Sequence, residues 1–201
     1  MGKTTNYLNS KLRFIFTLLF LIQCSTIRTM ERSPDLEKDL KTLKRVYVLV
    51  NPDNPVTIME NQTFQAIFQS LISHHSEFIL YPTPEGLKPG CSGFTDKNIE
   101  GYFYLSYKQK IDGDKIYLDI KSELKKCPGD SNIWMVEAED SYSLTSKENE
   151  SLRRMYVEKF GMGVESRVNP YYYLSKNILE KVVSPELTED EKDEKVIAGS
   201  N

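Results

Sequence analysis

Cysteine is the residue of this chain with the most distinctive chemistry, and Cys91 and Cys127 are two of its three copies. Neither belongs to a CxxC pair, which argues against redox catalysis and structural zinc. In an oxidising compartment we expect these two thiols to form a disulfide, and two free thiols are the alternative. The bond would close a loop of 36 residues, and chain entropy predicts a stabilisation of about 4 kcal/mol for that length.

The third cysteine, Cys24, directly follows the features of an export signal. Lys11 and Arg13 precede an apolar stretch over 14–22, and nine residues are too few for a membrane-spanning helix, which needs about 20. The small-residue cleavage site of an ordinary signal peptide is missing. The tetrapeptide Leu21-Ile22-Gln23-Cys24 stands in its place.

That tetrapeptide resembles a bacterial lipobox, in which the cysteine receives diacylglycerol and becomes residue one. The resemblance predicts a lipoprotein signal peptide over 1–23 and an anchor of acyl chains, palmitate among them, on Cys24. Gln23 departs from the Gly, Ala or Ser that usually precedes the cysteine, a departure that spirochaete lipoproteins tolerate. The alternative is an ordinary signal peptide or a short uncleaved anchor, with Cys24 incidental.

The sequence contains little that indicates a catalytic or metal-binding site. His74 and His75 are the only histidines, and neighbours on a helix point about 100° apart, so they cannot chelate one ion together. Asp112 and Asp114 begin a calcium-loop spacing, but Tyr117 occupies the position that needs glycine. The sequence contains no GxSxG, HExxH or Walker motif. We expect no catalytic residue, no metal and no cofactor.

Two other groups of residues could form a binding surface. Glu137 and Glu139 share one face of a predicted strand, next to Asp140, and a solvated edge is the ordinary interpretation. Eight tyrosines could build an aromatic surface, although strands favour tyrosine in any case. They are Tyr102, Tyr104, Tyr107, Tyr117, Tyr142, Tyr171, Tyr172 and Tyr173.

Composition excludes several classes of protein. A length of 201 residues suits one domain, and a net charge of −3 gives no basic footprint for nucleic acid. Residues 1–23 hold three basic residues and no acid, so the remaining 178 have a net charge of −6. With 39% hydrophobic and 27% charged residues, the chain is neither disordered nor a polytopic membrane protein.

Hydrophobic periodicity predicts the elements that position these residues. Apolar side chains at i, i+3, i+4, i+7 and i+8 from Phe64 to Ile72 predict an amphipathic helix. Asp112-Gly113 predicts a tight hairpin turn. Alternation and β-branched runs predict strands over 46–50, 77–81, 102–108, 115–122 and 133–139. A Pro- and Gly-rich loop over 82–100 holds Cys91.

The ends of the mature chain are predicted to be helical or irregular. Ser33-Pro34 begins a short helix over 34–43. Thr145 and Glu148 form a possible capping box for one helix, which Gly161 ends, and Asn169-Pro170 opens another. After Pro185 the chain turns acidic and loses its apolar periodicity, so we expect a frayed tail.

The predicted order is β-α-β-β-β-β-α-α. We expect an α+β fold with a mixed or mainly antiparallel sheet of about five strands and helices packed on one face. The predicted organisation is a lipoprotein signal peptide over 1–23, a lipidated tether and short helix over 24–44, a single α+β domain over 45–183 and an acidic tail over 184–201.

With these elements in hand, the mature chain resembles a class of small bacterial envelope lipoproteins. The class includes the periplasmic domain of the curli-secretion lipoprotein, activators of penicillin-binding proteins and auxiliary lipoproteins of transport systems. The likeness rests on the strand Arg45–Val50, the amphipathic helix, the run Gly113–Leu118, the pair Ile133-Trp134 and the C-terminal helix. Within the class, the chain is most similar to an uncharacterised lipoprotein family of leptospires and myxobacteria.

The resemblance implies a non-enzymatic role. We expect a binding, scaffold or accessory component of the bacterial cell envelope, held in the outer membrane or another envelope membrane with a periplasmic or surface face and assisting an envelope protein partner. One alternative is a surface-exposed adhesin. Another is an envelope hydrolase, whose only plausible general base is His74 or His75.

Overall fold

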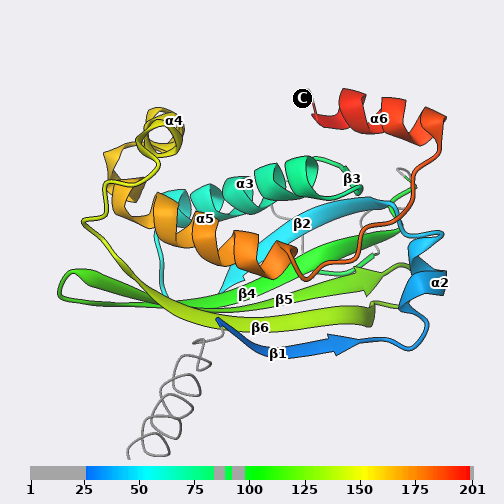
Figure 1. Ribbon diagram of the computed structural model, residues 1–201, viewed down its shortest axis with the longest axis horizontal. Helices are drawn as coiled ribbons and strands as arrows, with labels where there is room; N and C mark the ends of the chain where they lie inside the picture. Colours follow the sequence, from blue (N-terminus) through cyan, green and yellow to red (C-terminus); the bar gives the residue numbers. More distant parts are fainter. Residues whose placement is uncertain (1–25, 84–88, 92–97, 200–201) are drawn as a thin grey trace, which may run out of the picture.

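The computed structural model describes residues 26–83, 89–91 and 98–199, so the predicted signal peptide and Cys24 lie outside the described residues. A six-stranded sheet with the strand order β1-β6-β5-β4-β2-β3 forms the centre of the domain (Figure 1). The strands are β1 (Ile27–Arg32), β2 (Arg45–Pro52), β3 (Ile79–Leu80), β4 (Gly101–Asp112), β5 (Lys115–Lys126) and β6 (Ser131–Ser143). β2 runs parallel to β3 and β4, and the other neighbouring strands are antiparallel.

The two long helices cover one face of this sheet, and the predicted α+β class with a mixed sheet is confirmed (Figure 1). The helices are α2 (Leu36–Leu40), α3 (Ile58–His75), α4 (Glu150–Phe160), α5 (Glu165–Leu179) and α6 (Glu189–Gly199), with a short 3-10 turn over Met162–Val164. α3 begins with a capping box in which the Glu60 amide donates to Thr57 Oγ1 and the Thr57 amide donates to Glu60. This cap fixes the residue at which α3 begins.

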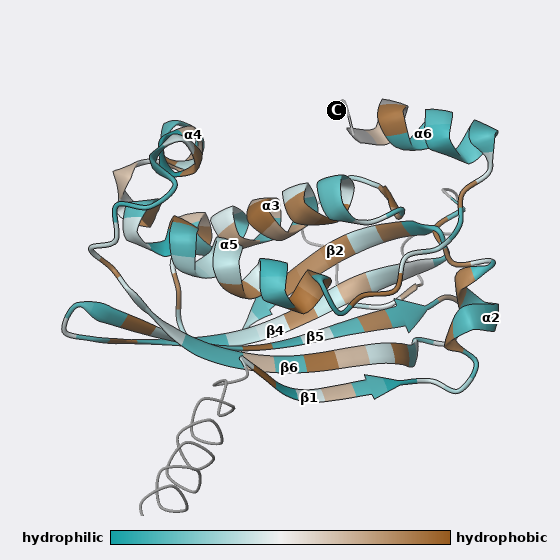
Figure 2. Cartoon of the chain, viewed as in Figure 1, coloured by the Kyte–Doolittle hydropathy of each residue, from teal (hydrophilic) through white to brown (hydrophobic). Residues whose placement is uncertain are grey.

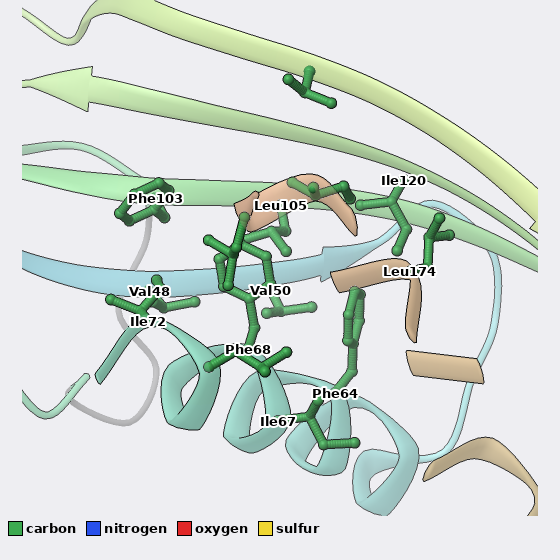
Figure 3. Packing of buried hydrophobic residues seen from close by; sticks show 14 of the residues in the cluster. Val48, Val50, Phe64, Ile67, Phe68, Ile72, Phe103, Leu105, Ile120 and Leu174 are labelled. Carbon is green, nitrogen blue, oxygen red and sulfur yellow. The ribbon is translucent and has the colours of Figure 1, made fainter. Parts of the chain in front are cut away.

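The core lies between α3, α5 and the helix-facing side of the sheet. The predicted apolar stripe of α3 enters it: Phe64, Ile67, Phe68 and Ile72 are at most 1% exposed. Figure 3 shows these side chains pointing toward residues of the neighbouring strands and of α5, namely Val48, Val50, Phe103, Leu105, Ile120 and Leu174. Burial of this stripe, rather than helix propensity, holds α3 against the sheet.

The sixth strand replaces part of the predicted tether. Residues 27–32 form β1, which pairs with β6 from Ile27 opposite Ala138 to Arg32 opposite Trp134. Most β1 side chains are exposed, so the segment lacks the apolar alternation that marks a strand in a sequence. Its position is decided by backbone pairing with β6, which only the folded sheet offers.

The predicted frayed tail over 184–201 is also corrected, because most of it forms α6. Lys44 Nζ lies 2.6 Å from a Glu191 carboxylate oxygen, and Arg45 contacts Glu194 through two nitrogens at 2.8 and 2.6 Å. Figure 2 shows α6 as mostly hydrophilic. The helix therefore docks by ion pairing and not by an apolar stripe, which is why its periodicity gave no signal.

Two predicted helix starts are also corrected. α5 begins at Glu165 and continues through Pro170, so the Asn169-Pro170 pair does not open it. α4 begins at Glu150 after Asn149, which has a left-handed backbone and makes no side-chain cap. The Thr145 hydroxyl instead contacts Ser143, so the predicted capping box is absent.

Candidate functional site

The side of the sheet opposite α3 and α5 is the candidate binding surface. We call it the open face, because Figure 1 shows α3, α4 and α5 on the other side. Residues of β4 alternate between the two sides: Phe103, Leu105 and Tyr107 are buried under the helices, whereas Tyr104 and Lys108 retain exposure. The open face therefore carries polar and aromatic side chains at every second position.

One end of the open face, the disulfide half, is covered. Cys91 and Cys127 are joined by a disulfide with a Cα–Cα distance of 5.6 Å, the pair predicted from the sequence. Beneath this segment the rings of Tyr47 and Tyr102 stack with their centroids 5.1 Å apart. The Tyr47 hydroxyl donates to the Gly90 carbonyl at 2.9 Å, and burial raises the pKa of both tyrosines. The disulfide thus fixes a loop over an aromatic pair.

The centre of the open face carries ordered charges. Glu123 is 9% exposed and lies 3.1 Å from Lys121 and 3.6 Å from Lys125. Lys125 Nζ also lies 5.5 Å from the centroid of the Tyr104 ring, within range of a cation–π interaction. Asn132 donates to the Glu123 carboxylate at 3.2 Å. These contacts fix a carboxylate between two lysines beside an accessible aromatic ring.

A small polar hollow lies next to this cluster. Arg28 of β1 reaches across β6, where its guanidinium lies 2.6 Å from Glu139 and 3.8 Å from Asp119 of β5. The hollow has a volume of about 230 Å³ and is lined by Arg28, Asp53, Ser106, Lys108, Asp119, Lys121 and Glu137. Glu137 and Glu139 do share a face as predicted, but β6 is an interior strand because β1 pairs beside it, so the predicted solvated edge is wrong.

A larger hollow of about 610 Å³ occupies the other end of the open face, next to the β4–β5 turn. Its lining includes Lys108, Lys110, Tyr117, Asp119, Glu139 and Ser141. We call this end the hairpin half. Asn54 borders it and extends the sheet, because its side-chain amide both donates to and accepts from the Gln109 backbone, at 2.8 and 3.0 Å.

The structure does not bring the histidines to this surface. His74 and His75 are both exposed at the end of α3. His74 Nδ1 lies 2.6 Å from the Ser70 carbonyl oxygen one turn earlier. Asp112 and Asp114 flank the β4–β5 turn, and within the described ranges no three His, Cys, Asp or Glu side chains are placed to hold a metal ion.

The tyrosines do not form one aromatic surface. Tyr107 and Tyr171 are buried in the core, where Tyr171 donates to Gln109 at 2.8 Å, and only Tyr104 and Tyr117 remain accessible on the open face. Sequence reasoning also missed the charge pattern of β5. Asp119, Lys121, Glu123 and Lys125 alternate in sign at every second residue, and this period-2 pattern could have indicated an ordered charged face. No comparable pattern in the sequence indicated that Arg28 would lie on the open face.

Comparison with known proteins yields only distant likenesses. No protein family matches the chain, and no curated protein matches it. The PelC dodecamer of Paraburkholderia phytofirmans has a similar structure at 12% identity and a TM-score of 0.48, over 77% of this chain and 96% of that chain. A hypothetical protein of Chlamydia trachomatis is 13% identical at a TM-score of 0.42, over 68% and 96%.

Bacterial lipoproteins are among these similar structures. A lipoprotein of Neisseria meningitidis is 11% identical at a TM-score of 0.41, over 63% of this chain and 96% of that chain. At such identities and TM-scores the likenesses assign neither a family nor a function to this protein. In the part of the chain that the structure describes, no helix has the length and hydropathy needed to cross a membrane.

Proposed function

We propose that this protein is a lipid-anchored component of the bacterial envelope that binds a partner protein and catalyses no reaction itself. The observation that carries this proposal is the open face, one side of a six-stranded sheet that no helix of the described residues covers. On it Glu123, Lys121, Lys125 and Arg28 are fixed by ion pairs. Prearranged charges of both signs favour a partner with a complementary pattern, because such patterns set register and exclude wrong partners.

The anchor is the second part of the proposal. Acyl chains on Cys24 would hold the domain at one membrane, and confinement to a surface raises the effective concentration of the protein for a partner there. The lipobox-like tetrapeptide before Cys24 supports this anchor. The exposed histidines, which lie at the end of α3 away from the open face, support a non-enzymatic role.

Metabolic labelling tests the anchor. The full chain, produced in a bacterial host and labelled with palmitate, is expected to carry the label, and Cys24→Ala is expected to lose it. Cys91→Ser, which leaves Cys24 intact, is the matched control and should stay labelled. Label that persists in Cys24→Ala would rule out this anchor.

Site-specific photocrosslinking in intact cells tests the partner surface. A photoreactive residue at Tyr104 on the open face is expected to give a discrete adduct, and one at the exposed Asp193 of α6 is not. The charge reversal Lys121→Glu should reduce the Tyr104 adduct about tenfold, since like charges across an interface are costly. Adducts of equal yield at both positions, or an adduct indifferent to Lys121→Glu, would contradict the proposed surface.

A further inference from the structure

We infer that the hairpin half of the open face lies against phospholipid headgroups when Cys24 is acylated. This inference rests on the proposed function, because it takes the lipid anchor at Cys24 as given. It adds an orientation: one end of the sheet faces the bilayer, and the disulfide half stands away from it. Three observations carry it: the length of the linker that follows Cys24, the place where the chain enters the sheet, and the residues that lie at that place.

The linker between Cys24 and the first residue held on the sheet is very short. Thr26 is held on β6, because the Glu139 amide donates to its carbonyl oxygen at 2.9 Å and its hydroxyl donates to Asp140 at 3.2 Å. Only Ser25 separates Thr26 from Cys24. A fully extended chain spans at most about 3.6 Å per residue, so the Cα atom of Cys24 lies within about 7 Å of that of Thr26. The expected spacer over 24–44 therefore cannot hold the domain away from the membrane.

The chain enters the sheet beside the hairpin half. Asp140, the partner of Thr26, pairs with Leu118, and the next residue of β6, Ser141, pairs with Tyr117. β5 is two strands away from β1, a distance of about 10 Å across the sheet. Tyr117 and the larger hollow are therefore within reach of the lipid headgroups that surround the anchor.

The exposed residues at this end suit a membrane interface. Tyr117 is 43% exposed on the open face, and Ile111, on the opposite side of the same hairpin, is 44% exposed. Aromatic and aliphatic side chains beside lysines are typical of the layer where headgroups meet acyl chains. The larger hollow opens beside Tyr117, so a headgroup can enter it next to Lys108 and Lys110.

The charges of the hairpin half are arranged for phosphate. Lys108, Lys110 and Lys115 are exposed, and none forms an ion pair with another described residue. Arg28 pairs with Asp119 and Glu139 and so offsets the charge of one of these two carboxylates. Asp112 and Asp114 at the turn leave the end nearly neutral overall. The acyl anchor therefore supplies most of the affinity, and the lysines orient the domain on anionic lipid.

Tryptophan quenching by brominated lipids tests the orientation. The acylated full chain is reconstituted into vesicles of phosphatidylcholine and phosphatidylglycerol with brominated acyl chains, as Tyr117→Trp and, in parallel, as Tyr104→Trp. Tyr104 lies on the same face, six residues along β4 from the partner of Tyr117, or about 20 Å farther from the hairpin. The native Trp134 is only 2% exposed and gives the same background in both variants.

The expected result is roughly threefold stronger quenching at position 117 than at position 104, since interfacial side chains lie within several ångströms of the acyl chains. Adding Lys108→Glu and Lys110→Glu to Tyr117→Trp should remove most of that difference in phosphatidylglycerol vesicles. Equal quenching at both positions, as expected if a protein partner covers the hairpin instead, would overturn the orientation while the anchor stands. Mass spectrometry of the same sample reports acylation of Cys24 separately, and its absence would overturn both proposals.

Discussion

Gly101 shows how a single residue limits the sheet at the start of β4. A Cβ atom at this position would collide with the Lys125 carbonyl oxygen of β5 and lie 2.9 Å from Leu43 Cδ1. Both neighbours are constrained, because the first belongs to the backbone ladder and the second is fully buried. Leu43, which follows α2, and Gly101, the first residue of β4, can therefore lie this close only because glycine has no side chain.

We expect Gly101→Ala to lower the free energy of unfolding by about 1–3 kcal/mol, the range typical of overpacked cores. Urea denaturation monitored by far-UV circular dichroism measures the change. Gly163→Ala is the matched control, because nothing lies within 4 Å of a Cβ atom built there. An unchanged midpoint for Gly101→Ala would mean that β4 and β5 can separate at this point at little cost.

At the scale of single elements, α6 differs from the other helices in how it is held. Its main contacts are ion pairs: Glu191 with Lys44, Glu194 with Arg45, and Lys195 with Glu77 at 3.2 Å. The Tyr81 hydroxyl adds a hydrogen bond to Glu194. The Lys44 ammonium, together with hydrogen bonds from Thr188, lowers the pKa of Glu191 to about 2. The pKa of Glu194 is also lowered, with Arg45 as the largest cause. Docking of α6 therefore depends on ionised carboxylates.

The pH dependence follows from the sign of these shifts. A carboxyl group whose pKa is lower in the docked state stabilises that state above its ordinary pKa of 4.5, and the contribution is lost as the pH falls toward about 2. We expect hydrogen exchange of the α6 amides to accelerate over this window relative to those of α3, which is held by buried apolar side chains. Salt at 1 M should also accelerate α6 exchange at pH 7, by a smaller amount, because these ion pairs are partly buried and salt screens them only in part.

The substitution Glu194→Gln distinguishes the loss of the α6 ion pairs from general unfolding in acid. It should accelerate α6 exchange at pH 7 and leave α3 exchange unchanged. Glu189→Gln, whose partner Lys192 belongs to α6 itself, should change the exchange of neither helix. If Glu194→Gln slowed or left unchanged the exchange of α6, apolar contacts would have to hold the helix.

At the scale of the whole molecule, the Cys91–Cys127 disulfide closes a loop of 36 residues that contains all of β4 and β5. We expect Cys91→Ser with Cys127→Ser to lower the free energy of unfolding by about 2–4 kcal/mol, chiefly by enlarging the unfolded ensemble. Chemical denaturation of the oxidised wild-type protein and the double variant measures this difference. Wild-type protein reduced with dithiothreitol should match the variant, and agreement of the oxidised protein with both would show that the bond contributes nothing.

Much of the architecture could be predicted from local patterns. The stripe from Phe64 to Ile72, the Asp112-Gly113 turn and the alternation in β5 identify their elements because each encodes its own buried face within a few residues. The same local logic offered Cys91 and Cys127 as a pair, since they were the two cysteines left after the export signal. It failed for β1 and α6, whose side chains are mostly exposed and whose partners lie more than 100 residues away in the sequence.

The helix-facing core, the hairpin and the lipobox-like tetrapeptide that ends at Cys24 can all be recognised in the sequence, because these features are local in the chain. The folded sheet, in contrast, makes β1 begin three residues after Cys24 and brings Arg28 to Asp119 and Glu139. It also decided which tyrosines enter the core and which stay on the open face. These outcomes depend on strand order and register, and a chain pattern with period two specifies a face of a strand but not the neighbour across it.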